Sequence, residues 1–268
     1  MADKTTNKAI LFDTTRCSGC RGCQVACKEW NEHETDETVF TGSYENPTKL
    51  SSNTWIRMRF DEVVRQGKLS FLFTRSSCMH CTNASCATVC PVKAITKTPE
   101  GFVHIDQSWC IGCGTCTEAC PFHIPHMNHH VGTATKCQAC TSVGLNRLAA
   151  GAEPACVKSC PPDALTYGNR DDLVTTGQQR VAALKAKGKT SAYLYGENEL
   201  GGLHVMYVLD DSPSVYGLPE NPQVATGDMA FKWIGGLATA GVVATLPLLW
   251  VLKRREKMEK LNGEGGAK

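Results

Sequence analysis

Cysteine is the residue type that could do the most chemistry in this chain of 268 residues, where it occurs sixteen times. The cysteines form four groups: Cys17, Cys20, Cys23 and Cys27; Cys78, Cys81, Cys86 and Cys90; Cys110, Cys113, Cys116 and Cys120; and Cys137, Cys140, Cys156 and Cys160. Closely spaced cysteines can wrap one face of an iron-sulfur cube, each thiolate on a separate iron, and a more distant cysteine then ligates the fourth iron. The spacing therefore predicts iron-sulfur clusters.

Zinc binding and disulfide bonding are two other uses of cysteine. A structural zinc site needs only two C-x-x-C pairs, so a third cysteine three to five residues further on has no role there. Disulfide frameworks belong to secreted proteins, but the stretch before Cys17 contains no signal peptide, and cysteines two residues apart rarely meet disulfide geometry. Iron clusters fit better than either, and a zinc-stabilised binding module stays the less favoured alternative.

The composition excludes nucleic acid as an expected partner. The chain is 42% hydrophobic and 20% charged, which is typical of a globular protein. Its net charge of +2 is too small to indicate nucleic-acid binding, and no basic stripe with interleaved aromatic residues is present.

The sequence around the cysteines repeats internally. ILFDTTRCSGC at the first group matches VHIDQSWCIGC at the third, with Asp13 and Asp106 each four residues ahead of the first cysteine. CPVKAIT from Cys90 matches CPPDALT from Cys160. Because these matches include Asp, Gly, Pro and Ala as well as the ligands, they indicate two kinds of half-motif that alternate along the chain.

The order of the half-motifs predicts a circular permutation. From Cys78 to Cys120 a CPxxA half precedes an Asp-led half, which is the order in bacterial two-cluster ferredoxins. The other two halves occur in the reverse order, at 8–27 and 137–166. The predicted fold class is therefore α+β, with two ferredoxin-like domains, one inserted in a circularly permuted other, and one C-terminal transmembrane helix.

The permuted repeat also predicts ligand sets, because the fourth cysteine of each ferredoxin run ligates the other cluster. Cluster A takes Cys17, Cys20, Cys23 and Cys160; cluster B takes Cys78, Cys81, Cys86 and Cys120; cluster C takes Cys110, Cys113, Cys116 and Cys90; and cluster D takes Cys137, Cys140, Cys156 and Cys27. The expected cofactors are four [4Fe-4S] clusters, and no catalytic residue is expected.

The segments between the cysteine groups must position them. Residues 8–13 are predicted as a strand, TWIRMRF and KLSFLFT as a hairpin, 171–187 as an amphipathic helix and 191–209 as two short strands. The histidines His123, His126, His129 and His130 are expected at the surface or beside ligands. The expected domains are 1–75 with 130–175 as the outer permuted domain, 76–129 as the inner domain, 176–228 as a bracing segment and linker, 229–253 as the transmembrane helix and 254–268 as a basic tail.

The predicted membrane span rests on residues 233–252, which carry no charge. A helix of this length spans about 30 Å, the thickness of the hydrocarbon core, and Trp233 and Trp250 would lie at the interfaces. Residues 253–260 contain five Lys or Arg, whereas Lys232 alone lies in the twenty residues before the span. Positive residues stay in the cytoplasm, so we expect a single-pass inner-membrane protein with a cytoplasmic C-terminus and a periplasmic cluster domain.

With these motifs, GGLHVMYVL at 201–209 and YGLPENP at 216–222, the chain resembles the beta subunits of membrane-bound respiratory formate dehydrogenases. EPACVKSCPPDAL and CIGCGTCTEACPFHIP are similar to motifs of the wider group of four-cluster subunits that serve molybdopterin oxidoreductases. The resemblance implies a non-catalytic electron-transfer subunit of an oxidoreductase complex, with no small-molecule substrate of its own. The implied partners are a molybdopterin (Mo or W) catalytic alpha subunit, a cytochrome b gamma subunit and the lipid bilayer.

The resemblance also implies an order of clusters, with the Cys17 set nearest the catalytic subunit, the Cys137 set nearest the membrane and the two inner-domain clusters between them. The alternative functions are an equivalent subunit of a membrane-bound nickel-iron hydrogenase or of another molybdopterin oxidoreductase. An independent enzyme that uses a cluster as Lewis acid would need a free iron, and four complete cysteine groups leave none.

The iron content tests the predicted cofactors directly. Protein purified without oxygen should contain about sixteen irons and about sixteen acid-labile sulfides per chain, because each cube holds four of each. About eight irons, or zinc in stoichiometric amount, would contradict the assignment of four cubes.

Overall fold

The computed structural model of the chain describes residues 7–65, 67–142, 146–227, 239–241, 243, 245–247 and 249–255. Two compact units make up the chain, Met1–Ala225 and Thr226–Lys268. All sixteen cysteines belong to the first unit, where none of them forms a disulfide.

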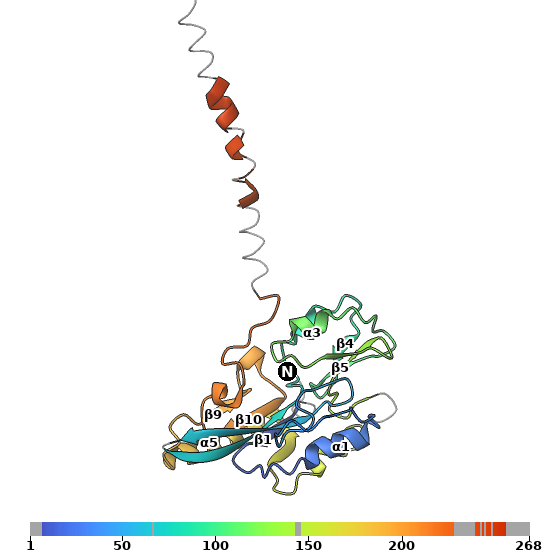
Figure 1. Cartoon of the computed structure of the whole chain (residues 1–268), viewed down its shortest axis with the longest axis vertical. Helices are drawn as coiled ribbons and strands as arrows, with labels where there is room; N and C mark the ends of the chain where they lie inside the picture. The colour runs from blue at the N-terminus through green and yellow to red at the C-terminus, as the bar shows by residue number, and fades with distance from the viewer. Residues whose placement is uncertain are drawn as a thin grey trace, which may run out of the picture. The chain divides into compact units, whose positions relative to one another are not determined.

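The first unit consists of short helices and strands (Figure 1). In chain order they are β1 (Lys8–Asp13), α1 (Gly22–Trp30), β2 (Arg57–Arg65), β3 (Lys68–Ser76), α2 (Ser85–Thr88), β4 (Ile95–Lys97), β5 (Val103–Ile105), α3 (Thr115–Ala119), β6 (His126–Asn128), β7 (Thr133–Thr135), α4 (Ala155–Lys158), β8 (Leu165–Asn169), α5 (Arg170–Ala186), β9 (Tyr193–Tyr195), the 3-10 helix η1 (Glu199–Gly201), β10 (Val205–Leu209) and the 3-10 helix η2 (Pro213–Tyr216). The strand predicted at 8–13, the hairpin predicted from TWIRMRF at 54–60 and KLSFLFT at 68–74, and the helix predicted at 171–187 are confirmed, with shifted ends.

A four-stranded sheet in the order β8-β1-β10-β9 organises the unit. β1 is antiparallel to β8 and parallel to β10. Because side chains alternate along a strand, Ala9 and Leu11 lie in the apolar cluster with α5, while Ile10 and Phe12 lie in the cluster that also contains several cysteines. Burial of β1 on both faces explains why its sequence is almost continuously apolar.

The two kinds of half-motif meet through the same strand pairing in both places where they are joined. Ile95 in β4 pairs with Ile105 in β5, and Leu165 in β8 pairs with Phe12 in β1. The amide of Asp106 donates to the carbonyl of Ala94 at 2.8 Å, and the amide of Asp13 donates to the carbonyl of Ala164 at 2.8 Å. β8 with β1 is therefore the outer counterpart of β4 with β5, which lie beside α3 in Figure 1.

The β2–β3 hairpin packs on the first cysteine loop. The rings of Phe60 and Phe73 contact each other edge to face, with centroids 5.3 Å apart. Gly19 between Cys17 and Cys20 has a φ of +66°, and a Cβ there would lie 2.9 Å from the Phe73 ring. Only glycine fits this turn, so the hairpin helps to fix the loop that carries the first cysteines.

Residues 176–228 contribute more than the bracing segment and linker that we expected. β10 lies in the middle of the main sheet, and all five of its residues are buried. Within the expected linker, η2 places Tyr216 in the core with 1% of its surface exposed. The Tyr216 hydroxyl donates to Asp210 at 2.5 Å, so a polar anchor holds this segment despite its Pro and Gly content.

The second unit contains the expected transmembrane helix at 229–253 and the expected basic tail at 254–268. Residues 228–238, 242, 244, 248 and 256–268, and with them most of these two predictions, lie outside the described residues. Residues 249–255 are helical. In the described part of the chain, no helix combines the length and the apolar character that a membrane crossing requires.

Candidate iron-sulfur centres

The two Asp-led cysteine runs share one local conformation. The carboxylate of Asp13 accepts hydrogen bonds from the amide and hydroxyl of Thr15 at 3.0 and 2.6 Å. The carboxylate of Asp106 accepts the same two bonds from Ser108 at 2.9 and 2.6 Å. Each turn leads into the first cysteine of its group, so the aspartates that repeat in the sequence are turn residues that aim the ligand loop.

Each Asp-led run continues from its loop into a helix that starts after a left-handed residue. Arg21 with a φ of 62° precedes α1, and Gly114 with a φ of 74° precedes α3. The third cysteine of each run, Cys23 or Cys116, then lies inside the helix and is buried. This geometry turns three thiols of one run toward one region.

Cys160 joins the first three cysteines of the chain, although it comes from the last group. Burial raises the pKa of Cys17, the Gly19 amide lowers it, and the negative charges of Cys160 and Cys20 raise it. Cys17 and Cys160 also pack against the buried cluster that contains Cys23, so these thiols are neighbours. The structure thus brings together the residues expected for cluster A.

Cys27 shows the complementary arrangement, because it comes from the first group but lies among cysteines of the last group. Burial raises the pKa of the Cys27 thiol well above its usual value, and the charges of Cys137, Cys156 and Cys140 raise it further. Asn31 donates from Nδ2 to the Cys27 sulfur at 3.6 Å. Cys27 thus lies among three cysteines of the last group, as expected for cluster D.

The inner domain brings its thiols together in the same way. Burial raises the pKa of Cys81, and Cys78, Cys120 and Cys86 raise it further, which is the composition expected for cluster B. Burial also raises the pKa of Cys116 to about 11, with contributions from Cys86, Cys110 and Cys113.

Cys90, the remaining ligand expected for cluster C, packs with Cys110 against the buried cluster that contains Cys116. All sixteen thiols therefore lie near members of their expected sets. Which thiolate binds which iron stays a prediction.

Contacts between different sets give their spatial order. Cys23 of set A interacts with Cys156 of set D. Burial raises the pKa of the Cys23 thiol to about 12, the positive charge of Arg75 acts against this rise, and the negative charge of Cys156 adds to it. Burial raises the pKa of Cys78 of set B to about 11, Lys136 lowers it, and Cys137 of set D raises it. Together with the pair of Cys86 and Cys116, these contacts give the sequence A, D, B, C.

This order corrects the one implied by the resemblance. The Cys137 set lies between the Cys17 set and the inner domain, and it is not a terminus of the series. The four cysteines of set D are all buried, whereas the two exposed cysteines, Cys20 and Cys113, belong to sets A and C. The ends of the series therefore reach the surface at sets A and C.

Hydrogen bonds to the sulfur atoms suit anionic thiolates bound to iron. Amides donate to cysteine sulfurs from Gly19 to Cys17 at 3.4 Å, from Gly22 to Cys20 at 3.5 Å, from His80 to Cys78 at 3.5 Å, from Ala134 to Cys110 at 3.4 Å and from Ala139 to Cys137 at 3.5 Å. Bonds of this type orient the ligands and tune cluster potentials. The donor set of four soft thiolates per site, with amides behind them, fits [4Fe-4S] clusters.

A single-ion site is a different arrangement from a cube. Among the described residues, no three His, Cys, Asp or Glu side chains surround one point as the ligands of one metal ion do. A four-iron cube attaches each thiolate to a separate iron, so its ligands stand apart. The absence of a single-ion cage therefore carries no argument against cubes.

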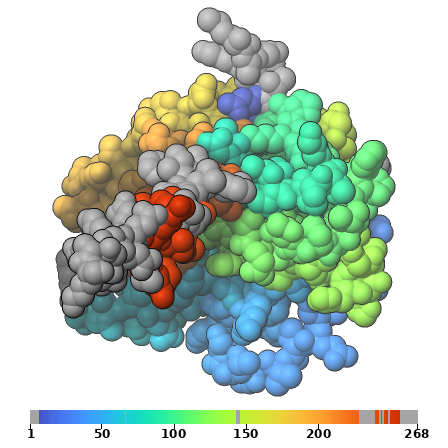
Figure 2. Space-filling model, turned by 90° about the horizontal axis from the view of Figure 1, so that it is seen from above, coloured from blue at the N-terminus to red at the C-terminus, as the bar shows by residue number. Residues whose placement is uncertain are grey.

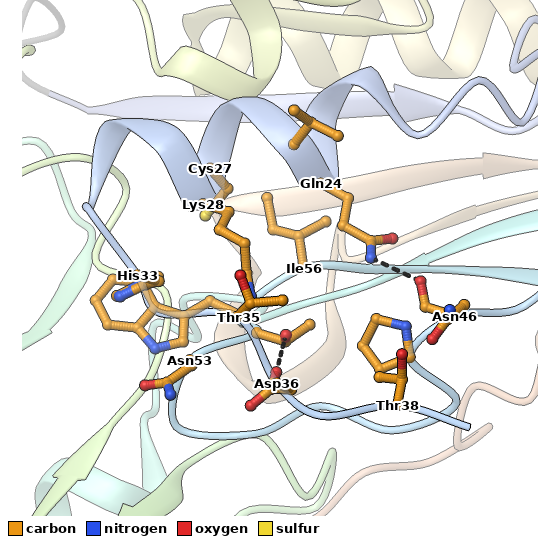
Figure 3. A pocket seen from close by; sticks show the side chains of 14 residues that line it. Gln24, Cys27, Lys28, His33, Thr35, Asp36, Thr38, Asn46, Asn53 and Ile56 are labelled. Carbon is orange, nitrogen blue, oxygen red and sulfur yellow. Dashed lines mark hydrogen bonds between the residues drawn. The ribbon is translucent and has the colours of Figure 1, made fainter. Parts of the chain in front are cut away.

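A cavity beside α1 reaches the back of Cys27 (Figure 3). It has a volume of ≈ 200 Å³ and is also lined by residues from the loop after α1, which forms part of the light-blue lobe in Figure 2. The carboxylate of Asp36 accepts hydrogen bonds from the hydroxyls of Ser51 and Thr54, so it ties the loop together. The Gln24 amide donates to the Asn46 carbonyl at 3.2 Å, another bond within the wall. The polar groups of the cavity thus serve the fold of the loop.

Two buried cations were missed by the sequence reasoning. Arg75 and Lys136 are each 1% exposed and lie next to cysteines of sets D and B. Arg75 directly follows the predicted strand KLSFLFT, and Lys136 precedes Cys137. Neither position has a local pattern that reveals burial. Only the position of Lys136 directly before a ligand could have drawn attention to it.

Comparison with known proteins gives the family. Models of the 4Fe-4S dicluster domain match residues 16–94 and 69–170. The iron-sulfur subunit of the nitrate-inducible formate dehydrogenase of Escherichia coli is 41% identical over 248 residues, 91% of this chain and 83% of that protein. The formate dehydrogenase-O iron-sulfur subunit of Escherichia coli is 42% identical over 242 residues, 88% of this chain and 79% of that protein.

A third relative is a subunit of a different oxidoreductase. A thiosulfate reductase electron transfer subunit of Salmonella typhi is 37% identical over 199 residues, which cover 73% of this chain and 95% of that protein. Two dicluster domains and four complete cysteine groups mean four [4Fe-4S] clusters in this chain, as the spacing predicted.

The spatial order of the sets can be measured magnetically. In protein with all four clusters reduced, pulsed EPR distances should be longest between clusters A and C, because these are the ends of the series. A Cys20→Ser variant and a Cys113→Ser variant identify the two end signals, since these are the exposed ligands of each set. A longest distance between A and D would contradict the order and restore the one implied by the resemblance.

Proposed function

We propose a route for electrons from one premise: the chain belongs to the family of formate dehydrogenase iron-sulfur subunits and acts in electron transfer. The route runs along the clusters in the order A, D, B, C, between two surfaces of the first unit. The observation that carries this proposal is the pattern of exposure, in which Cys20 and Cys113 are the exposed thiols and every thiol of set D is buried. Electrons enter at one exposed end and leave at the other.

The ligand sets of the four clusters are part of the same proposal and follow from the permuted repeat. Each cluster takes three thiolates from one half-motif and the fourth from its partner half, as listed for clusters A to D above. The matching registers of β8 with β1 and of β4 with β5 support an inner domain over 76–129 inserted in a permuted outer domain built from 1–75 and 130–175. The crossing of Cys27 and Cys160 is the feature that joins the two outer halves.

The chain's own residues determine how well such a route conducts. Each bound cluster supplies a carrier for one electron. The strand pairs fix the spacing between sets, and the amides of Gly19, His80 and Ala139 donate hydrogen bonds that stabilise negative charge on cysteine sulfurs. Burial shields all four thiols of set D from solvent. No residue of this chain needs to bind a substrate, so the subunit is non-catalytic by itself.

The proposed partners are those of a respiratory complex. Electrons come from a molybdopterin catalytic subunit that contains Mo or W and oxidises formate, and they pass to a cytochrome b subunit in the membrane. The uncharged stretch at 233–252 supports a single membrane span, with the cluster domain in the periplasm and the C-terminus in the cytoplasm. A second candidate is the same role beside another oxidoreductase, which the match to a thiosulfate reductase subunit favours.

Substitution of single ligands tests the crossed sets. Cys160→Ser and Cys20→Ser should alter the same EPR signal, because both residues belong to cluster A, while Cys27→Ser should alter the signal that Cys140→Ser alters. The matched pair of Cys27 and Cys160 controls for general damage, since each is the last cysteine of its group. If Cys160→Ser instead perturbs the signal of the Cys140 set, the permuted assignment is wrong.

Membrane orientation is tested by proteolysis. Protease added to intact spheroplasts should digest residues 1–228 and leave the tail after Lys253, because the basic residues at 253–260 stay in the cytoplasm. Antibodies against each end of the chain report the two parts separately. Survival of the cluster domain under these conditions, with digestion only after permeabilisation, would reverse the orientation.

A further inference from the structure

Arg75 is a buried cation that has no acidic partner among the described residues. It is the last residue but one of β3 and has 1% of its surface exposed. Its Nη2 donates to the Cys156 sulfur at 3.7 Å. Its Nη1 donates to the Ser77 hydroxyl, and its Nε has no hydrogen-bond partner. None of the ion pairs among the described residues involves Arg75.

Such a charge requires a negative partner. An unpaired ion in a protein interior costs several kcal/mol, and arginine does not escape this cost by deprotonation. After burial, the thiols whose charges act most strongly on Arg75 are those of Cys156 and Cys137, two expected ligands of cluster D. The carbonyl of Arg75 accepts a hydrogen bond from the Tyr207 hydroxyl at 2.6 Å, which fixes the backbone from which the guanidinium extends.

Lys136 repeats this arrangement beside cluster B. It is also 1% exposed, and its Nζ donates to the carbonyls of Val103 and, at 3.0 Å, of Cys137. It too is absent from the ion pairs of the described residues. Lys136 lines one small cavity together with Cys78, Cys81, Cys86 and Cys120, the four expected ligands of cluster B. After burial itself, its charge has the largest effect on the pKa of the Cys78 and Cys86 thiols.

We propose that Arg75 and Lys136 are positioning residues for electron transfer that set the reduction potentials of the two interior clusters, Arg75 for cluster D and Lys136 for cluster B. Reduction adds a negative charge to a cluster, and burial disfavours it, so the interior clusters would have the lower potentials if burial acted alone. A fixed positive charge beside each opposes this effect. The inference rests on the proposed ligand sets, which the cysteine variants above test separately.

End cluster C lacks this device, and end cluster A shares the charge of Arg75, which also acts on Cys23. The charges that act on Cys116 of set C come from other cysteines, and its neighbour Cys113 is open to solvent. Water stabilises added charge at the ends, whereas Arg75 and Lys136 do so in the interior. The two cations therefore bring the buried and the exposed clusters toward a common range of potentials, which electron flow in single steps requires.

EPR-monitored redox titration of the full chain, loaded with its clusters, tests this assignment. Arg75→Gln should lower the midpoint of the cluster D signal by at least about 59 mV, a tenfold change in the reduction equilibrium for one electron, and leave the cluster B midpoint within about 18 mV, a twofold change. Lys136→Gln should do the reverse. Lys158→Gln is the matched control, because Lys158 follows Cys156 by two residues but is exposed to solvent.

A variant that keeps the charge separates electrostatics from packing. Arg75→Lys should give a cluster D midpoint between those of the native protein and Arg75→Gln, since its shorter side chain holds the charge farther from Cys156. Equal shifts of all four midpoints, or an unchanged cluster D midpoint in Arg75→Gln, would overturn the proposal. If the Arg75→Gln variant binds fewer irons than the native chain, the Arg75→Lys variant becomes the test. A cluster D midpoint equal to the native one in Arg75→Lys would then overturn the proposal.

Discussion

The antiparallel pairing between a strand that follows a CPxxA segment and a strand that leads into an Asp-led cysteine run is the interaction on which the rest of the structure depends. It occurs as β4 with β5 and as β8 with β1, with the same register and the same hydrogen bond from aspartate to alanine. The pairing holds two half-motifs together, so that the last cysteine of each can reach the other's cluster. Without it, Cys27 and Cys160 would have no route to the groups at the far end of the chain.

Burial of thiolates creates the electrostatic problem that this fold has to solve. Thiols must lose their protons to bind iron, and burial raises the pKa of most of them, as at Cys23 and Cys27. Iron supplies part of the compensating charge. Backbone amides and two buried cations, Arg75 and Lys136, supply more of it in the interior. The same charges that stabilise the sites therefore bear on how readily each one accepts an electron.

Much of the architecture could be predicted because its signals are local or repeated. Alternation and composition located β1 and the β2–β3 hairpin, and the repeated Asp and Pro residues revealed which half-motifs correspond. The parallel pairing of Ile10 with Val205 has no local signal, so β10 was taken for part of a bracing segment.

The remaining errors have the same cause, which is dependence on tertiary contacts. Tyr216 is anchored by Asp210 within a segment of linker composition, and Arg75 is buried in a strand whose pattern does not distinguish it from a surface residue. The order of the clusters was taken from the resemblance and needed correction, since spacing within a group says nothing about which groups adjoin. The proximity of Cys78 and Cys137 decides that point, and it exists only in the folded chain.

Diffraction from crystals of the loaded protein at the iron absorption edge tests the central claim most directly. The account predicts four iron clusters in the order A, D, B, C, with the Cys160 sulfur on the cluster of Cys17 and the Cys27 sulfur on the cluster of Cys137. A cluster held by Cys17, Cys20, Cys23 and Cys27 together would contradict it.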